Sequence, residues 1–254
     1  MSIWSAGRYE AVARRIAPIA TQLVEIVDRL RPLDGIALAD LACGTGNAAL
    51  AAAAAGAEVT GVDLTPELLA IAADKPGGDA VRWVSADASA TGLPDQGFDV
   101  VLSNMGIIFV EPVSQVAEIV RLLRQGGFLG FSTWVRDSEN PFFDPIVEVL
   151  GPRPAAGYTP DQWGEADIIT TRLSDDFDEI FIENDSLTWR FDSIDDAVRF
   201  ITAESPMHVE TLAHLDEATR ARLVDAFTAA LGAHSTADGV AFDASYSVVA
   251  ARRR

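Results

Sequence analysis

The sequence predicts a doubly wound α/β fold with a mostly parallel sheet, and three observations support this prediction. From residue 36 onward, apolar runs of strand length alternate with segments of helical periodicity. The first three of these runs end at or beside an acidic residue, and a glycine pair follows the first run. Such alternation favours a parallel sheet, and ligands of such sheets bind at the carboxyl ends of the strands.

The first expected element is a helical segment from Arg8 to Leu30. Its apolar residues recur at helical spacing: Val12, Ile16, Ile19, Leu23, Ile26, Val27 and Leu30. Pro18 interrupts the pattern, and proline inside a helix removes a hydrogen bond and clashes with the preceding turn. We therefore expect two helices that meet at Pro18, followed by a break at Pro32 and Gly35.

The next elements are expected to form a cofactor-binding core over residues 36–135. Expected strands cover 36–41, 58–62, 81–86, 98–102 and 127–133, and expected helices cover 46–55, 66–74 and 113–123. The second helix carries clear start signals, because Thr65 is a favoured N-cap residue and Pro66 suits the first helical turn. The order βαβαβ, continued by more of the same, indicates a doubly wound sheet.

The chain after Trp134 is expected to be irregular and then to resume regular structure. The irregular stretch contains Pro141, Pro145, Pro152, Pro154, Gly157 and Pro160. Expected elements beyond it are helices over 165–174, 193–203 and 216–231 and strands over 183–191 and 240–250. We interpret residues 1–254 as a single domain with an N-terminal helical segment (1–35), the core (36–135) and a substrate cap with closing strands (136–254).

Composition narrows the classes of partner. The formal net charge of -19 opposes binding to nucleic-acid phosphates, and no apolar run reaches the roughly 18 to 20 residues of a membrane span. The single cysteine, Cys43, excludes a disulfide within the chain and disfavours a cysteine-based metal site, so no metal is expected. We expect a cytoplasmic protein with a small-molecule substrate, either a monomer or a homodimer.

The glycine pair leaves two cofactor classes open. Residues 44–49 read Gly-Thr-Gly-Asn-Ala-Ala, which satisfies a dinucleotide-binding fingerprint, and Asp63 lies where a ribose-binding acid would be. Asp40 argues against a nicotinamide cofactor, because a carboxylate gains nothing beside a pyrophosphate but suits a cationic amino group. Asp87 can accept a hydrogen bond from the adenine amine. Together these acids favour S-adenosylmethionine over NAD(P).

Four ordered blocks carry a family resemblance. They are LADLACGTGNAAL at 38–50, GVDLTPELL at 61–69, ADASATGLPDQGFDVVLSN at 86–104 and VRLLRQGGFLGFSTW at 120–134. Over residues 4–135 the chain resembles the class I S-adenosylmethionine-dependent methyltransferases, in particular the small-molecule branch that includes the ubiquinone and menaquinone biosynthesis type. The resemblance implies a Rossmann-like sheet of seven strands with an antiparallel last strand, N-terminal helices and a helical cap.

The resemblance also implies the cofactor site, with S-adenosyl-L-methionine as the cofactor and S-adenosyl-L-homocysteine as its product. The glycine loop would cradle the methionine part, Asp63 would bind the ribose, Leu64 would pack on adenine, and Asp87 with Ala88 would read its edge. The implied binding residues are Tyr9, Asp40, Gly44, Thr45, Gly46, Asp63, Leu64, Asp87, Ala88, Ser103 and Asn104. For Cys43 we expect packing.

Methyl transfer is an in-line displacement at an activated carbon, so positioning of the reactants supplies much of the rate. A hydroxyl acceptor benefits from a base, whereas an amine or an activated carbon needs only orientation. His208, after the break at Ser205 and Pro206, is the candidate base, with a packing or surface role as the alternative. A binding module without catalysis stays open as well. Candidate walls of an apolar substrate pocket, or ordinary core residues, are Trp134, Phe142, Phe143, Tyr158, Trp163 and Phe200.

Overall fold

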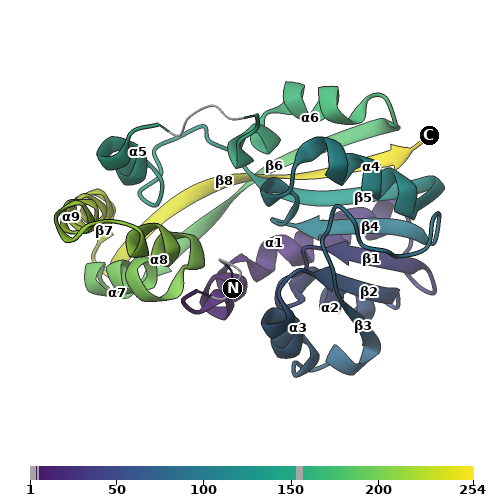
Figure 1. Cartoon of the computed structure of the whole chain (residues 1–254), viewed down its shortest axis with the longest axis horizontal. Helices are drawn as coiled ribbons and strands as arrows, with labels where there is room; N and C mark the ends of the chain where they lie inside the picture. The colour runs from purple at the N-terminus through teal and green to yellow at the C-terminus, as the bar shows by residue number, and fades with distance from the viewer. Residues whose placement is uncertain (1–3, 5, 153–156) are drawn as a thin grey trace. The chain divides into compact units, whose positions relative to one another are not determined.

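One sheet organises the chain, and its strand order is β3-β2-β1-β4-β5-β8-β6, with β7 paired to β8 (Figure 1). The computed structural model describes residues 4, 6–152 and 157–254. The strands are β1 (Ala37–Leu41), β2 (Glu58–Asp63), β3 (Val81–Ser85), β4 (Phe98–Asn104), β5 (Leu123–Trp134), β6 (Phe177–Phe191), β7 (Ser235–Thr236) and β8 (Gly239–Arg253). The described residues thus form an eight-stranded sheet in which β3 and β6 lie at the two ends of the main order.

Helices fill the connections. The α-helices are α1 (Tyr9–Leu30), α2 (Asn47–Ala54), α3 (Pro66–Ala73), α4 (Pro112–Leu122), α5 (Asp144–Leu150), α6 (Ala166–Leu173), α7 (Ile194–Arg199), α8 (Pro206–Ala213) and α9 (Glu217–Gly232). Shorter turns are η2 (Gly78–Ala80), η3 (Ile107–Phe109), η4 (Pro160–Gly164) and the π-helix η5 (Phe200–Glu204).

The predicted fold class is confirmed. Strands β3, β2, β1, β4 and β5 run parallel to one another, and β8 runs antiparallel to β5. The strand order reverses between β1 and β4, where Asp40 lies opposite Gly61 on one side and Leu102 on the other. A reversal of this kind is a topological switch point, outside which α/β proteins bind their ligands.

Helices cover both faces of the parallel strands. On one face, Phe131 and Leu129 of β5 belong to a buried cluster with Ile119 of α4 and Leu173 of α6. On the other face, a Cβ at Gly130 would lie 2.5 Å from a Val27 methyl group of α1, so glycine permits the close approach of that helix. Each fully buried aliphatic side chain of this kind stabilises the fold by about 1.5–3 kcal/mol.

The prediction of two N-terminal helices that meet at Pro18 is wrong, because α1 is continuous from Tyr9 to Leu30. Ile16 and Ile19 on either side of Pro18 are buried, and so are Leu23 and Val27 further along. Burial along one face outweighs the roughly 3 kcal/mol that an interior proline costs a helix.

Other differences lie after Trp134. The stretch expected to be irregular contains α5 and η4, and α8 covers a segment for which no helix was expected. Strand β6 begins at Phe177, earlier than predicted, and the helix expected over 193–203 divides into α7 and the π-helix η5. Pro154 lies outside the described residues.

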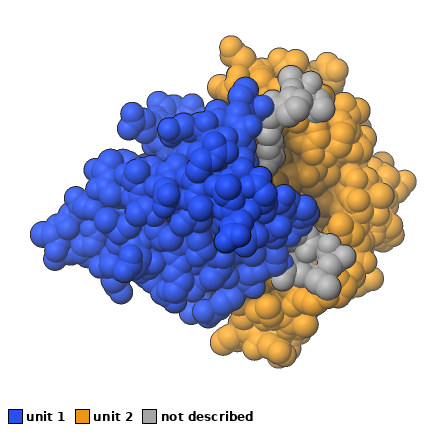
Figure 2. Space-filling model, turned by 60° about the vertical axis from the view of Figure 1, so that its left-hand side comes forward, with its two compact units in different colours: residues 1–15, 136–156, 186–245 blue, residues 16–135, 157–185, 246–254 orange. Residues whose placement is uncertain are grey.

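The chain divides into two compact units, shown in blue and orange in Figure 2. Unit 1 comprises residues 1–15, 136–156 and 186–245, and unit 2 comprises residues 16–135, 157–185 and 246–254. Helix α1 and strands β6 and β8 run through both. Within the described part of the chain, no helix combines the length and apolarity that a membrane crossing requires.

Each unit has its own aromatic packing. In unit 1 the Phe142 ring contacts the rings of Trp189, Phe191, Phe200, Phe242 and His208. In unit 2 Trp163 is fully buried against Phe131. Phe142, Phe200 and Trp163, three of the candidate pocket walls, therefore serve as core residues of their units.

Candidate functional site

The loop from Ala42 to Gly46 at the end of β1 has an unusual backbone. Ala42, Gly44 and Gly46 have φ values of 51°, 56° and 82°, in the left-handed region that favours glycine. A Cβ at Gly46 would also lie 2.6 Å from the Trp83 ring, and one at Gly61 would lie 2.5 Å from it. Gly46 and Gly61 are thus required, because any side chain at either position would clash with the Trp83 ring of β3.

Asp63, the last residue of β2, fixes this loop to the following turn. Its Oδ2 accepts a hydrogen bond from the Gly44 amide at 2.8 Å, and its Oδ1 accepts one from the Thr65 amide at 2.8 Å. Burial raises the pKa of the Asp63 carboxyl, and the hydrogen bonds from Thr65 and Gly44 oppose that rise. Each carboxylate oxygen has a second lone pair, so both remain able to accept from hydroxyl groups.

Asp40 of β1 supplies the cap that α2 otherwise lacks. The N-cap residue of α2 is Gly46, which has no side chain, and Asp40 Oδ2 accepts the Ala49 amide of the first turn at 2.8 Å. Asp40 Oδ1 is buried and has no hydrogen-bond partner among the described residues. Burial raises the pKa of Asp40 to about 8, and the negative charge of Asp63 adds to the rise.

These two acids create a site suited to a cation. Two buried carboxyl groups disfavour each other's ionisation, and a positive charge placed between them favours the ionised forms. Burial, followed by the charges of Asp40 and Asp63, raises the pKa of the neighbouring Cys43 thiol. Cys43 is therefore an unreactive thiol, which agrees with a packing role.

Three of the predicted binding residues hold the site together through their own bonds. Thr45 is buried, and its carbonyl and hydroxyl oxygens accept from Lys75 Nζ at 2.9 and 3.0 Å. Ser103 donates to the Leu41 carbonyl at 2.8 Å, and Asn104 Oδ1 accepts from Ser132 Oγ at 2.9 Å. These contacts attach the glycine loop to the turn after α3, β1 to β4, and β4 to β5.

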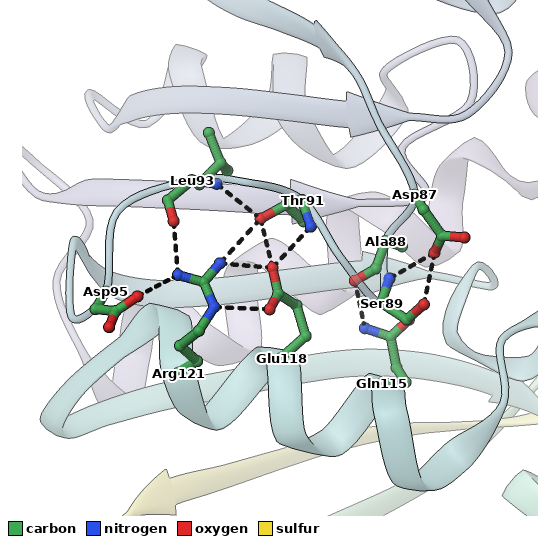
Figure 3. A network of polar contacts seen from close by, with 9 residues as sticks. All are labelled: Asp87, Ala88, Ser89, Thr91, Leu93, Asp95, Gln115, Glu118 and Arg121. Carbon is green, nitrogen blue, oxygen red and sulfur yellow. Dashed lines mark hydrogen bonds and ion pairs between the residues drawn. The ribbon is translucent and has the colours of Figure 1, made fainter.

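The predicted adenine-binding residues lie at the ends of β2 and β3. Leu64 is 62% exposed, which is high for a leucine beside a buried acid. Asp87 Oδ1 accepts from the Ser89 amide at 2.8 Å and from the Ser89 hydroxyl at 2.7 Å, while the Ala88 carbonyl accepts from Gln115 Nε2 at 3.2 Å (Figure 3). Asp87 and Leu64 are thus exposed beside a constrained loop.

Eight of the predicted binding residues, all in unit 2, lie at the ends of β1, β2 and β4 or in the turns that follow them: Asp40, Gly44, Thr45, Gly46, Asp63, Leu64, Ser103 and Asn104. Asp87 and Ala88, also in unit 2, follow β3. Tyr9 and His208 belong to unit 1. There the rings of Trp4 and Tyr9 meet edge to face with centroids 5.9 Å apart.

His208 is buried in unit 1 with both ring nitrogens engaged. Nε2 lies 2.9 Å from the Phe142 carbonyl, which can only accept, so Nε2 donates and Nδ1 accepts from the Ser205 hydroxyl at 2.7 Å. Burial lowers the pKa of His208. This geometry favours a packing role for His208 over the predicted role of a base.

The lowered pKa of His208 predicts acid sensitivity of the fold. Above the unfolded-state pKa of about 6.5 the ring is neutral in both states, and as pH falls below that value the unfolded state gains the proton first. We expect the thermal midpoint of the wild type to decline from pH 6.5 to pH 5, and His208→Gln to flatten this decline. His214→Gln is the matched control, because His214 is 73% exposed. An identical decline in all three proteins would contradict the prediction.

The sequence did not indicate Lys75 or the polar face of α4 as parts of the site. Nothing near Lys75 in the sequence distinguishes it from a surface lysine. Gln115, Glu118 and Arg121 do recur every third residue among apolar neighbours, which is a detectable signal. Over the described ranges, no group of three or more His, Cys, Asp or Glu residues is placed to hold a metal ion.

Comparisons with known proteins identify a methyltransferase domain in this chain. Residues 39–131 match the model of a methyltransferase domain. An uncharacterized protein of Mycobacterium tuberculosis is 32% identical over 266 aligned positions, covering 100% of this chain and 93% of the relative. Demethylmenaquinone methyltransferase of Clavibacter sepedonicus is 37% identical over 98 residues, 38% of this chain and 40% of that protein.

A solved structure shares the fold. Phosphoethanolamine N-methyltransferase 2 of Haemonchus contortus, in complex with phosphomonomethylethanolamine and S-adenosylhomocysteine, matches with a TM-score of 0.56 at 21% identity. The match covers 91% of this chain and 52% of that chain.

Proposed function

The chain belongs to the class I S-adenosylmethionine-dependent methyltransferases, and from this premise we propose that it transfers the methyl group to a small organic molecule by in-line displacement. The observation that carries the proposal is the buried Asp40 carboxyl beside the glycine loop, with one oxygen lacking a partner among the described residues. A cationic amino group supplies the missing donor, and a dinucleotide pyrophosphate does not.

The residues of unit 2 fit the parts of S-adenosylmethionine. The loop from Ala42 to Gly46, with its left-handed residues, would hold the methionine part, and Asp40 would meet its amino group. Asp63 would accept from the ribose hydroxyls, and the exposed Leu64 would cover one face of adenine. Asp87 and Ala88 would read the edge of the base. When bound, the cofactor supplies a methyl carbon activated by a sulfonium.

The chain's contribution to the reaction is then orientation. The loop and the strand ends are fixed to one another by hydrogen bonds between the side chains of Asp63 and Ser103 and backbone groups, so they can hold a ligand without rearrangement. The nitrogens of His208 are already bonded within unit 1, and the proposal therefore assigns no base to it. An amine or an activated carbon acceptor suits such a site better than an unactivated hydroxyl.

Two measurements test the proposal. Calorimetric titration should show binding of S-adenosylhomocysteine and no comparable binding of NAD; tight binding of NAD alone would refute it. The second measurement incubates the protein with isotopically labelled S-adenosylmethionine and a metabolite extract, with mass readout. Label should move to a small molecule, whereas binding without any transfer would favour the alternative of a non-catalytic binding module.

A further inference from the structure

The segment from Ala86 to Gly97, between β3 and β4, is held partly by internal hydrogen bonds, such as those from Ser89 to Asp87, and partly by bonds to α4. Its regular structure is limited to the isolated bridge between Asp87 and Ala90. Buried backbone groups nonetheless need hydrogen-bond partners. In this segment several of those partners are side chains of α4, as Figure 3 shows.

Helix α4 presents two faces. Val116, Ile119 and Leu122 are buried in the apolar cluster of the sheet. Gln115, Glu118 and Arg121 follow one another at three-residue spacing, which places them along one side of the helix. This polar stripe faces the segment over 86–97 and forms hydrogen bonds with its backbone, while the apolar face of the helix packs on the sheet.

Glu118 forms the centre of the stripe. Its Oε1 accepts from the Thr91 amide at 2.8 Å and from the Thr91 hydroxyl at 2.6 Å. Arg121 donates to both Glu118 oxygens, from Nε at 2.8 Å and from Nη2 at 2.7 Å. Hydrogen bonds from Arg121 lower the pKa of Glu118 to about 2, so the carboxylate is charged over the whole physiological range.

Arg121 extends the contact toward β4. Its Nη1 donates to the Leu93 carbonyl at 2.7 Å and to the Asp95 carboxylate. The Arg121 carbonyl in turn accepts from the Gln96 amide at 2.8 Å. The second half of the segment, from Leu93 to Gln96, is therefore bound to the C-terminal end of α4 through both side-chain and backbone groups.

Gln115 contacts the first half of the segment at Ala88, where the proposed adenine contact lies. It is 1% exposed and donates through Nε2 to the Ala88 carbonyl, while its Oε1 has no partner among the described residues. A buried amide with an unsatisfied oxygen is unfavourable in a core. The geometry therefore indicates that the role of Gln115 at this buried position is its hydrogen bond to the Ala88 carbonyl.

We propose that Gln115, Glu118 and Arg121 are positioning residues that hold Asp87 and Ala88 against the edge of the purine and so set a preference for a 6-amino purine over a 6-oxo purine. The inference rests on the proposed function, because it assumes that Asp87 and Ala88 face the base. A 6-amino group donates to the Asp87 carboxylate, whereas a 6-oxo group places two acceptors opposite each other. Discrimination thus depends on where the segment holds Asp87.

The test compares the dissociation constants of S-adenosylhomocysteine and S-inosylhomocysteine by calorimetry. Gln115→Leu removes the bond to Ala88. Thr91→Val removes, with little change in volume, both the bond that the Thr91 hydroxyl donates to Glu118 and the bond that it accepts from the Leu93 amide. Each variant should weaken S-adenosylhomocysteine binding about threefold to tenfold and leave S-inosylhomocysteine binding nearly unchanged, so the preference falls by the same factor. Ile119→Val is the matched control, because it removes a buried methyl group from the other face of α4.

The outcomes are distinct. Loss of preference in Gln115→Leu and Thr91→Val, with the wild-type ratio kept in Ile119→Val, supports the inference. Equal weakening of both ligands, or an unchanged ratio in the two variants, overturns it and leaves the proposed function standing. A wild type that binds neither ligand overturns both. Thermal melts of all four proteins show that the variants compared are folded, and Thr91→Val serves alone if Gln115→Leu does not fold.

Discussion

Asp63→Ala is expected to weaken S-adenosylhomocysteine binding by about 2–3 kcal/mol, or about 30- to 150-fold, which is the upper part of the range for hydrogen bonds to a charged group. The proposed ribose contact is one part of this loss. The other part is the loop itself, because Asp63 accepts from the amides of Gly44 and Thr65. Removing the carboxylate leaves both amides without this partner and frees the glycine loop.

Calorimetry with Asp63→Ala, Asp63→Asn and the control Asp74→Ala tests this prediction. Asp63→Asn should also bind weakly, since its amide nitrogen would face a backbone donor at one of the two contacts. Asp74 is an exposed acid at the end of α3, so Asp74→Ala changes the net charge equally without touching the loop. If Asp63→Ala kept wild-type affinity, the cofactor would have to bind elsewhere.

The second large effect concerns Asp40, whose replacement should raise stability and reduce binding together. The folded-state pKa of about 8 lies above the ordinary value of 3.8, so the folded protein retains a proton that the unfolded chain releases. The stability that this group contributes is complete below about pH 4 and is lost as pH rises through about 8. At about 1.4 kcal/mol per pKa unit, we expect Asp40→Asn to stabilise the ligand-free protein at pH 8–9 by about 2–5 kcal/mol.

Binding should respond in the opposite direction. A cationic amino group favours the ionised carboxylate, so wild-type affinity for S-adenosylhomocysteine should fall as pH decreases from 8 to 6, with a proton released on binding. Asp40→Asn should bind weakly with a flatter pH profile, and Asp79→Asn, at an exposed acid of the same unit, should match the wild type. Urea denaturation and calorimetry across this range measure both effects. A variant that is less stable at pH 9 would contradict the raised pKa.

The sequence predicted those parts of the fold that local patterns determine. Strand ends at Asp40 and Asp63 were recognisable because apolar runs stop there, and the parallel order with an antiparallel last strand is confirmed. The predicted break at Pro18 is wrong, because a local rule about proline ignores the burial that Ile16 and Ile19 gain in one continuous helix.

The site was less accessible to sequence reasoning than the fold. That Asp63 would bond to Gly44 across 19 residues, or Lys75 to Thr45 across 30, depends on how β2 and α3 pack beside the loop. The two partners that occupy His208, Ser205 and Phe142, include one that is 66 residues away. Contacts between residues so far apart in the sequence follow from tertiary packing, and no periodic pattern in the sequence indicates them.

Strand β6 bears on how copies of this protein can associate. It ends the main strand order of the sheet, and its segment within unit 2 carries four carboxylates, Asp178, Glu179, Glu183 and Asp185. Glu179 has a left-handed φ of 49°, which departs from regular strand geometry. Asp178 and Glu179 are paired with Arg252 of β8, so Glu183 and Asp185 are the acids that two such edges would bring near each other, beside an irregular backbone. An acidic and irregular edge of this kind disfavours pairing with the same edge of a second copy.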